Sequence, residues 1–161
     1  TNASKMNTHA EQRYPYALPA VFLWLGFLLA ISFMEAWLKF RAPGVTISIG
    51  LGIGKLVFGA LNKVEWVLII ITAANFFFVP QKITSYRNIT FILAALMTAL
   101  ETFWGLPALD KIASQIIAGG VDNTPSVHVI YVSMEVLKLF MLILLGIYLV
   151  KKHQKINHAN N

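Results

Sequence analysis

Long apolar runs alternate with short polar segments along the chain. Three runs are almost uninterrupted, at about 17–40, 89–109 and 127–150, and a fourth, at about 57–79, is interrupted near its start by Asn62, Lys63 and Glu65. Each run approaches the roughly 20 residues that a helix needs to cross the hydrocarbon of a bilayer. The pattern predicts an all-α fold, an integral membrane four-helix bundle with up-down-up-down topology.

The connections between the runs contain small residues and residues that end helices. Pro43 and Gly44 stop the first run, and Pro107 lies near the end of the third as a stop or a kink. The segment 45–63 carries four glycines, and 111–120 has an amphipathic pattern. Because small residues permit close approach of helices in a membrane, we expect short interfacial helices in these two outer connections.

The chain has room for one folded domain between two polar ends. We expect a disordered cytoplasmic tail at 1–13, with residues 1–5 interpreted as a vector remnant because Met6 follows them. A four-span membrane domain is expected at 14–151 and a basic cytoplasmic tail at 152–161. The first apolar run is too long for a removable signal peptide, so it is interpreted as a retained span.

Composition and charge agree with a membrane protein and give it an orientation. Of the 161 residues, 57% are hydrophobic and 12% are charged, which is far outside the range of soluble domains. In a four-span layout, seven basic residues fall on the side of the termini and five on the other side. The positive-inside rule therefore places both termini in the cytoplasm, and we expect the bacterial inner membrane as the location.

Several classes of site and partner are excluded or not expected. The chain has no cysteine, which excludes disulfides, thiolate metal sites and cysteine nucleophiles. The glycine series lacks the Gly-Lys-Ser/Thr end of a phosphate loop, so no nucleotide is expected, and no haem is predicted. The basic C-terminal segment has no interleaved aromatic residues, so nucleic acid is not expected either. The expected partner is the lipid bilayer, with a second copy of the chain or other subunits of a membrane complex as further candidates.

One glutamate lies in each apolar run: Glu35, Glu65, Glu101 and Glu135. Counted from the approximate outer ends of the runs, the four lie 6, 7, 9 and 8 residues inward, or roughly 9–14 Å at the helical rise per residue. A carboxylate inside a span is costly unless it is protonated, paired or bound to a metal. We therefore predict a layer of four carboxylates that faces the interior of the bundle.

One interpretation of this layer is a cation site, with two metal ions as one form of it. Four-helix carboxylate proteins hold two metal ions with a Glu from each helix and two Glu-x-x-His motifs, and this chain has the four glutamates without those motifs. His128, two turns before Glu135, and Asp110 at the outer rim are further candidate ligands. Such donors suit Fe, Mn, Zn or Ca. Activity as a membrane metal-dependent oxidoreductase is left open, and no catalytic residue is assigned.

Two other interpretations use the same layer. In a proton- or cation-coupled transporter, Lys138 would be the charge that controls ionisation of the glutamates. In a non-catalytic subunit of a membrane complex, buried Glu and Lys pairs would fix the register of the helices. The lysines available for pairing are Lys39, Lys63 and Lys138, two to four residues from a glutamate, with Lys63 on a different face from its neighbour.

Four short motifs follow one another along the chain. FRAP ends the run at 17–40, GKLVFGAL leads into the run at 57–79, ETFWGLP ends the run at 89–109, and HVIYVSME opens the run at 127–150. Their order resembles that in the transmembrane protein 205-like family of four-span membrane proteins. The resemblance implies the fold and polar residues in the third and fourth spans, and it implies no enzyme activity. Where that family has Asn, this chain has Glu101 and Glu135, which turns neutral amides into groups able to bind cations.

Overall fold

The computed structural model describes residues 14–79, 81–120 and 125–159, and within them it contains helices and no strand. The expected tail at 1–13 lies outside these residues. In chain order the elements are α2 (Ala17–Leu28), the π-helix η1 (Leu29–Glu35), α3 (Ala36–Leu38), the 3-10 helix η2 (Lys39–Arg41), α4 (Ile47–Phe78), α5 (Tyr86–Leu100), the π-helix η3 (Glu101–Gly105), α6 (Leu106–Ile117) and α7 (Pro125–Ala159). The predicted all-α fold is confirmed.

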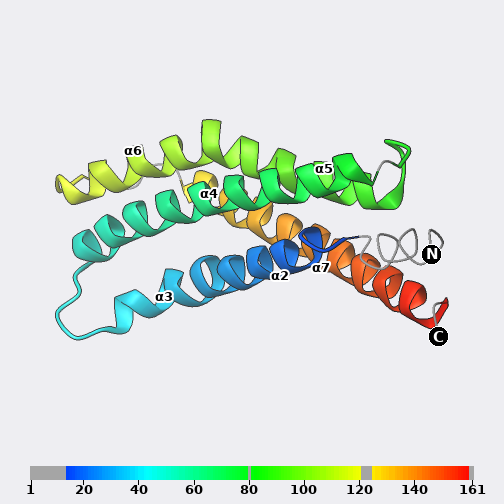
Figure 1. Ribbon diagram of the computed structural model, residues 1–161. Helices are drawn as coiled ribbons and strands as arrows, with labels where there is room; N and C mark the ends of the chain where they lie inside the picture. The colour runs from blue at the N-terminus through cyan, green and yellow to red at the C-terminus, as the bar shows by residue number, and fades with distance from the viewer. Residues whose placement is uncertain (1–13, 80, 121–124, 160–161) are drawn as a thin grey trace.

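These elements join into four long helices, and each is long and apolar enough to cross a membrane. The four span Ala17–Arg41, Ile47–Phe78, Tyr86–Ile117 and Ser126–Lys155. They run up and down, so α2 begins and α7 ends at the same end of the bundle (Figure 1). We call this the terminal end, and the opposite end, where η2 and α6 finish, the distal end. Four such helices fit a polytopic integral membrane protein.

The first helix lies between the second and the fourth. α2 packs against α4 on one side and against α7 on the other. The third helix completes the bundle, because α5 packs on α7 and α6 packs on α4. Figure 1 shows α7 behind α2 and beneath α5. All four helices can therefore direct side chains into one interior.

The two segments expected to form short interfacial helices are helical, but they continue the spanning helices. α4 starts at Ile47 after Thr46, whose side chain accepts a hydrogen bond from the Ile49 amide at 3.3 Å as an N-cap. No proline interrupts α4 from that cap to Phe78. Glycine inside a helix is tolerated in membrane spans, so the glycine series does not end it. At the C-terminus, α7 continues beyond residue 151 to Ala159.

Two glutamates coincide with the two π-helices. Glu35 is the last residue of η1, and Glu101 is the first residue of η3. η3 ends two residues before Pro107, which has no amide hydrogen to donate to the carbonyl of Phe103, so the wider turn lies where the α-helical ladder would be broken. π-helical turns within α-helices occur often at functional sites.

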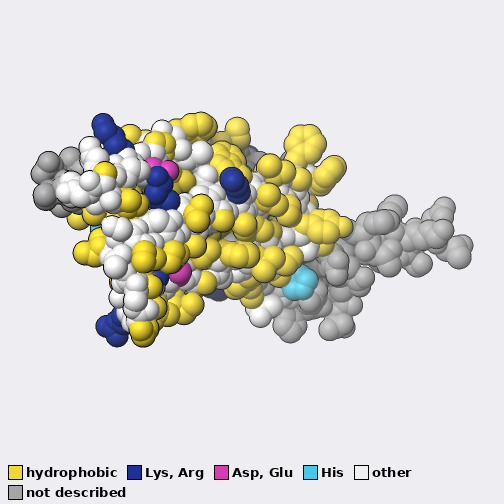
Figure 2. Space-filling view, turned by 90° about the vertical axis from the view of Figure 1, so that its left-hand side faces the viewer, with side chains coloured by type: hydrophobic (Ala, Val, Ile, Leu, Met, Phe, Trp, Pro, Cys, Tyr) yellow, Lys and Arg dark blue, Asp and Glu magenta, His cyan; other side chains and the backbone are white. Residues whose placement is uncertain are grey.

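The interior and the surface of the bundle differ in the expected way for a protein surrounded by lipid. Val21, Trp24, Leu28, Leu142 and Leu145 are fully buried in a core shared by α2 and α7. On the face that Figure 2 shows, hydrophobic side chains cover much of the surface and charged side chains form only small groups. Exposed apolar surface of this extent is stable against lipid tails.

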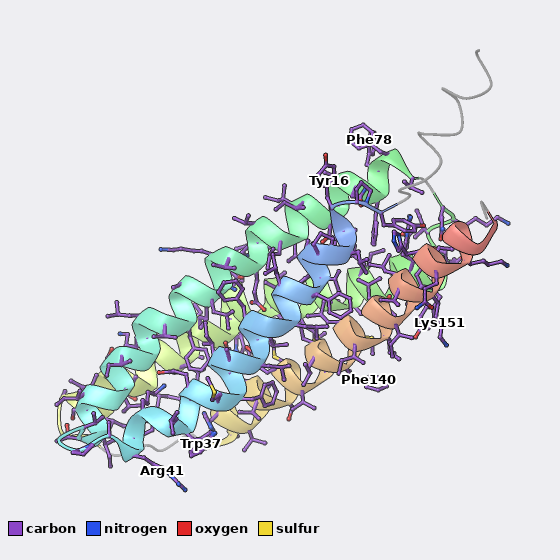
Figure 3. The ribbon with its side chains drawn as sticks, turned by 60° about the horizontal axis from the view of Figure 1, so that its bottom comes forward. Tyr16, Trp37, Arg41, Phe78, Phe140 and Lys151 are labelled. Atoms are coloured by element: carbon purple, nitrogen blue, oxygen red, sulfur yellow. The ribbon has the colours of Figure 1, made fainter. Side chains whose placement is uncertain are left out.

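Aromatic and basic side chains mark the two ends. Trp37 and Arg41 lie at the distal end, and Tyr16, Phe78 and Lys151 lie toward the terminal end (Figure 3). Tyr16 is 67% exposed and Trp37 is 51% exposed. Tyr and Trp are enriched where membrane meets water, so these positions agree with the two interfaces of a bilayer.

Arg87 holds the terminal end of the bundle together. It lies in the first turn of α5 and is buried. Its guanidinium donates to the carbonyl of Val79 at 2.8 Å and to the hydroxyl of Tyr14 at 3.3 Å, and it lies 4.2 Å from the ring centre of Phe76. One side chain thus joins the start of α5, the end of α4 and the residues before α2.

Candidate functional site: a buried glutamate and lysine cluster

Lys138 of α7 lies at the centre of a buried group of carboxylates. Its Nζ lies 2.7 Å from Oε1 of Glu65 and 3.5 Å from Oε2 of Glu135, and it donates a hydrogen bond to Oε2 of Glu101. The Lys138 side chain is completely buried, and each of the three carboxylate side chains is at most 3% exposed. We call these four residues the glutamate and lysine cluster.

Helical geometry explains why these side chains meet. Glu135 and Lys138 are three residues apart on α7 and so project from one face. Glu101 comes from the start of η3, and Glu65 comes from the buried face of α4. Their similar predicted depth agrees with this contact, because the three helices carry their carboxylates to one level of the bundle.

The first helix contributes Trp24 to the cluster. The indole Nε1 of Trp24 donates a hydrogen bond to Oε1 of Glu65 at 2.8 Å, and Trp24 is completely buried. Sequence reasoning missed this residue. A usable signal is its place in the middle of the first apolar run, away from the interface where Trp is common, because a buried indole N–H needs an acceptor.

The cluster has more carboxylate than ammonium. Three carboxylates face Lys138, so full ionisation leaves two excess negative charges away from water. Such charges require protons or further cations as compensation. Within residues 14–79, 81–120 and 125–159, no group forms a hydrogen bond with Oε1 of Glu101 or with either carboxylate oxygen of Glu135. The hydroxyls of Tyr131 and Ser32 lie near the carboxylate of Glu135.

Glu35, the fourth predicted glutamate, lies apart from the cluster. It forms a salt bridge of 3.2 Å with Lys39, four residues later on the same helix, and its side chain is 25% exposed. Lys63 is exposed and forms no salt bridge with a glutamate in the described part of the chain. The structure thus brings together three of the four predicted carboxylates and one of the three candidate lysines.

A second polar contact joins α4 to η3 beside the cluster. The amide of Asn62 donates to the hydroxyl of Thr102 at 2.9 Å, and the indole of Trp66 donates to the same oxygen at 3.0 Å. Thr102 follows Glu101 directly, and Asn62 comes three residues before Glu65. These uncharged hydrogen bonds hold η3 against α4 in the orientation in which Glu101 contacts Lys138.

A cavity of about 520 Å³ links the cluster to the distal surface. We call it the distal cavity. Buried Glu135 lines it, and so do the two predicted rim residues, Asp110 and His128, which are both exposed. Asp110 lies 4.0 Å from Nζ of Lys55. Asp110 and His128 thus share the lining of the cavity with Glu135, which is the cluster residue that reaches it.

The predicted metal ligands do not form a recognisable metal site. Within the described residues, no group of three or more Asp, Glu and His side chains has an arrangement that could hold a metal ion. Lys138 occupies the position between the carboxylates where a bound cation would be expected to lie. The metal site stays a prediction.

Comparison with known proteins adds no family. No family model matches the chain, and neither curated proteins nor solved structures give a match. Membership of the transmembrane protein 205-like family stays a prediction. The function must therefore be inferred from the cluster and the distal cavity of a polytopic membrane protein.

Proposed function

We propose that the protein is a small membrane transporter that exchanges protons for a cationic solute at the glutamate and lysine cluster. The observation that carries this proposal is the position of Glu135. It belongs to the cluster and lines the distal cavity, and no residue in the described part of the chain forms a hydrogen bond with its two carboxylate oxygens. Acidic residues inside spans that face a cavity are typical of proton and ion pathways.

Charge balance supplies the coupling in this proposal. Lys138 compensates one of three carboxylates, and the remaining charge is compensated either by protons or by a solute that enters from the distal cavity. A cation that binds beside Glu135 therefore favours release of a proton, and a proton that binds favours release of the cation. Trp24 and Lys138 hold Glu65 in place while Glu135 exchanges its partner.

The proposed orientation places the terminal end in the cytoplasm of a cell whose inner membrane holds the protein. Lys82, Lys151 and Lys152 lie at that end, beside the ends of α4 and α7. Basic residues next to spans remain on the cytoplasmic side. The distal cavity then faces the outside of the cell.

The first test is a flux measurement with Glu135→Gln. Purified protein is reconstituted in liposomes that have an acidic lumen, and Na⁺, K⁺, Ca²⁺ and tetraphenylphosphonium are added outside one at a time. With wild-type protein we expect at least one cation to raise the lumenal pH, because the cation enters as a proton leaves. Glu135→Gln removes the exchanging carboxylate and is expected to slow the initial rate by at least about tenfold.

Lys63→Gln is the control, because it also removes a charge by substitution with glutamine, but from an exposed side chain that belongs neither to the cluster nor to the lining of the distal cavity. It is expected to keep most of the exchange rate. An equal loss in the two variants would contradict the role given to Glu135. Absence of any cation-dependent pH change with folded wild-type protein would overturn the proposed function.

A further inference from the structure

We propose that the distal cavity is a binding site for a hydrophobic organic cation. This inference names the solute class for the proposed transporter, and it rests on that function for the consequence of binding but not for the binding itself. Three features of the cavity support it: the balance of its charges, the aromatic side chains in its wall, and the buried carboxylate at its inner end.

The lysines of the cavity already have carboxylate partners of their own. Lys39 pairs with Glu35 at 3.2 Å, and Lys55 lies 4.0 Å from Asp110. Each of these pairs is neutral as a unit, so neither lysine leaves an excess positive charge that would select an anion. Among the described residues, Lys138 is the one ammonium in contact with Glu135, and it also contacts Glu65 and Glu101. The inner end of the cavity thus has negative charge to spare.

Aromatic rings form much of the cavity wall and already hold one cation. Nζ of Lys39 lies 5.3 Å from the ring centre of Phe58 and 5.5 Å from that of Phe40. Phe33 and Tyr131 also line the cavity, and no Lys or Arg among the described residues lies over either ring. Faces of aromatic rings attract cations, most strongly where water is excluded. Tyr131 packs edge-to-face on Phe58, with 5.9 Å between the ring centres, so the aromatic wall is continuous beside the ring that already holds Lys39.

The carboxylate of Glu135 is the anchor for the positive centre. Glu135 lines the cavity and is 2% exposed, and no described residue forms a hydrogen bond with either of its carboxylate oxygens. Ser32 also lines the cavity, and its buried hydroxyl forms no hydrogen bond with the residues that the structure describes. A volume of about 520 Å³ lies within the range of sites for small molecules. An apolar cation with aromatic groups can pair with the carboxylate of Glu135 and also pack on the aromatic rings of the cavity wall. A hydrated inorganic ion can make only the first of these interactions.

Binding can be measured with two probes of nearly equal size and opposite charge. Detergent-purified protein is dialysed to equilibrium against tetraphenylphosphonium or tetraphenylborate, with protein-free micelles to correct for partitioning. We expect saturable binding of about one phosphonium per chain and at least about tenfold weaker binding of the borate. Equal saturable binding of the two ions, or no saturable binding of the phosphonium, would overturn the inference.

Two variants locate the site and separate it from effects on folding. Glu135→Gln and Phe58→Leu are each expected to weaken phosphonium binding, the first by at least about tenfold. Phe103→Leu is the matched control for Phe58→Leu, because Phe103 is 80% exposed on η3 and does not line the cavity. Unchanged binding in both Glu135→Gln and Phe58→Leu would place the ligand elsewhere.

Failure of this inference can be distinguished from failure of the proposed function. The dialysis measurement needs no gradient and no transport. Exchange of protons for inorganic cations without phosphonium binding would overturn the solute class alone. Saturable phosphonium binding at Glu135 without exchange in liposomes would overturn the transport function and leave the binding site.

Discussion

Replacement of Lys138 by methionine is expected to destabilise the protein by about 3–5 kcal/mol, the usual cost of removing one partner from a buried ion pair. Lys138 is the cation that contacts Glu65, Glu101 and Glu135, and it is completely buried. Without its ammonium, three carboxylates remain at one level of the bundle with no positive partner in contact. Thermal unfolding in detergent, followed by circular dichroism, measures the loss.

The control for this substitution is Lys63→Met. Lys63 is exposed on α4, so the same chemical change there should leave the unfolding temperature almost unaltered. A second variant tests the cause directly. Adding Glu101→Gln to Lys138→Met removes one uncompensated carboxylate and should recover part of the lost stability. A Lys138→Met protein as stable as the wild type would show that the cluster does not depend on its lysine.

Replacement of Arg87 by alanine is expected to cost about 3 kcal/mol, because it removes buried hydrogen bonds from a charged donor and a desolvated cation–π contact. Arg87 joins Val79, Tyr14 and Phe76 at the terminal end of the bundle. Its loss should loosen the connection between α4 and α5. The expected results are a lower unfolding temperature and faster proteolysis of the segment 79–86.

Arg87→Lys distinguishes charge from shape at this position. Lysine keeps the positive charge but lacks the planar guanidinium that stacks on Phe76 and donates to two partners at once, so it should restore little of the stability. Lys82→Ala serves as the control, since Lys82 is an exposed basic residue in the same connection. Full stability of Arg87→Lys would mean that charge alone holds this end together.

Much of the architecture follows from the sequence because it depends on local properties. The length of each apolar run sets the number of spans, and the rise per residue sets how deep a side chain lies along its helix. These two rules predict the four helices and the shared level of Glu65, Glu101 and Glu135, which meet around Lys138. Pairing of Lys39 with Glu35 likewise follows from a spacing of four residues.

Only the tertiary structure decided whether each glutamate side chain points into the cluster or away from it. Each residue turns a helix by about 100°, so one added residue in a π-turn redirects everything that follows. η1 ends at Glu35, which lies apart from the cluster, and η3 begins at Glu101, which lies within it. No periodicity in the sequence reveals these turns.

The sequence by itself determined that this is a four-helix membrane protein with costly carboxylates at one depth. The tertiary structure decided which carboxylates share Lys138, that Trp24 supports Glu65, and that a cavity reaches Glu135. The physical reason is that depth along a helix is a property of one segment. Contact and cavities depend instead on the rotation of four helices against one another, which long-range packing sets.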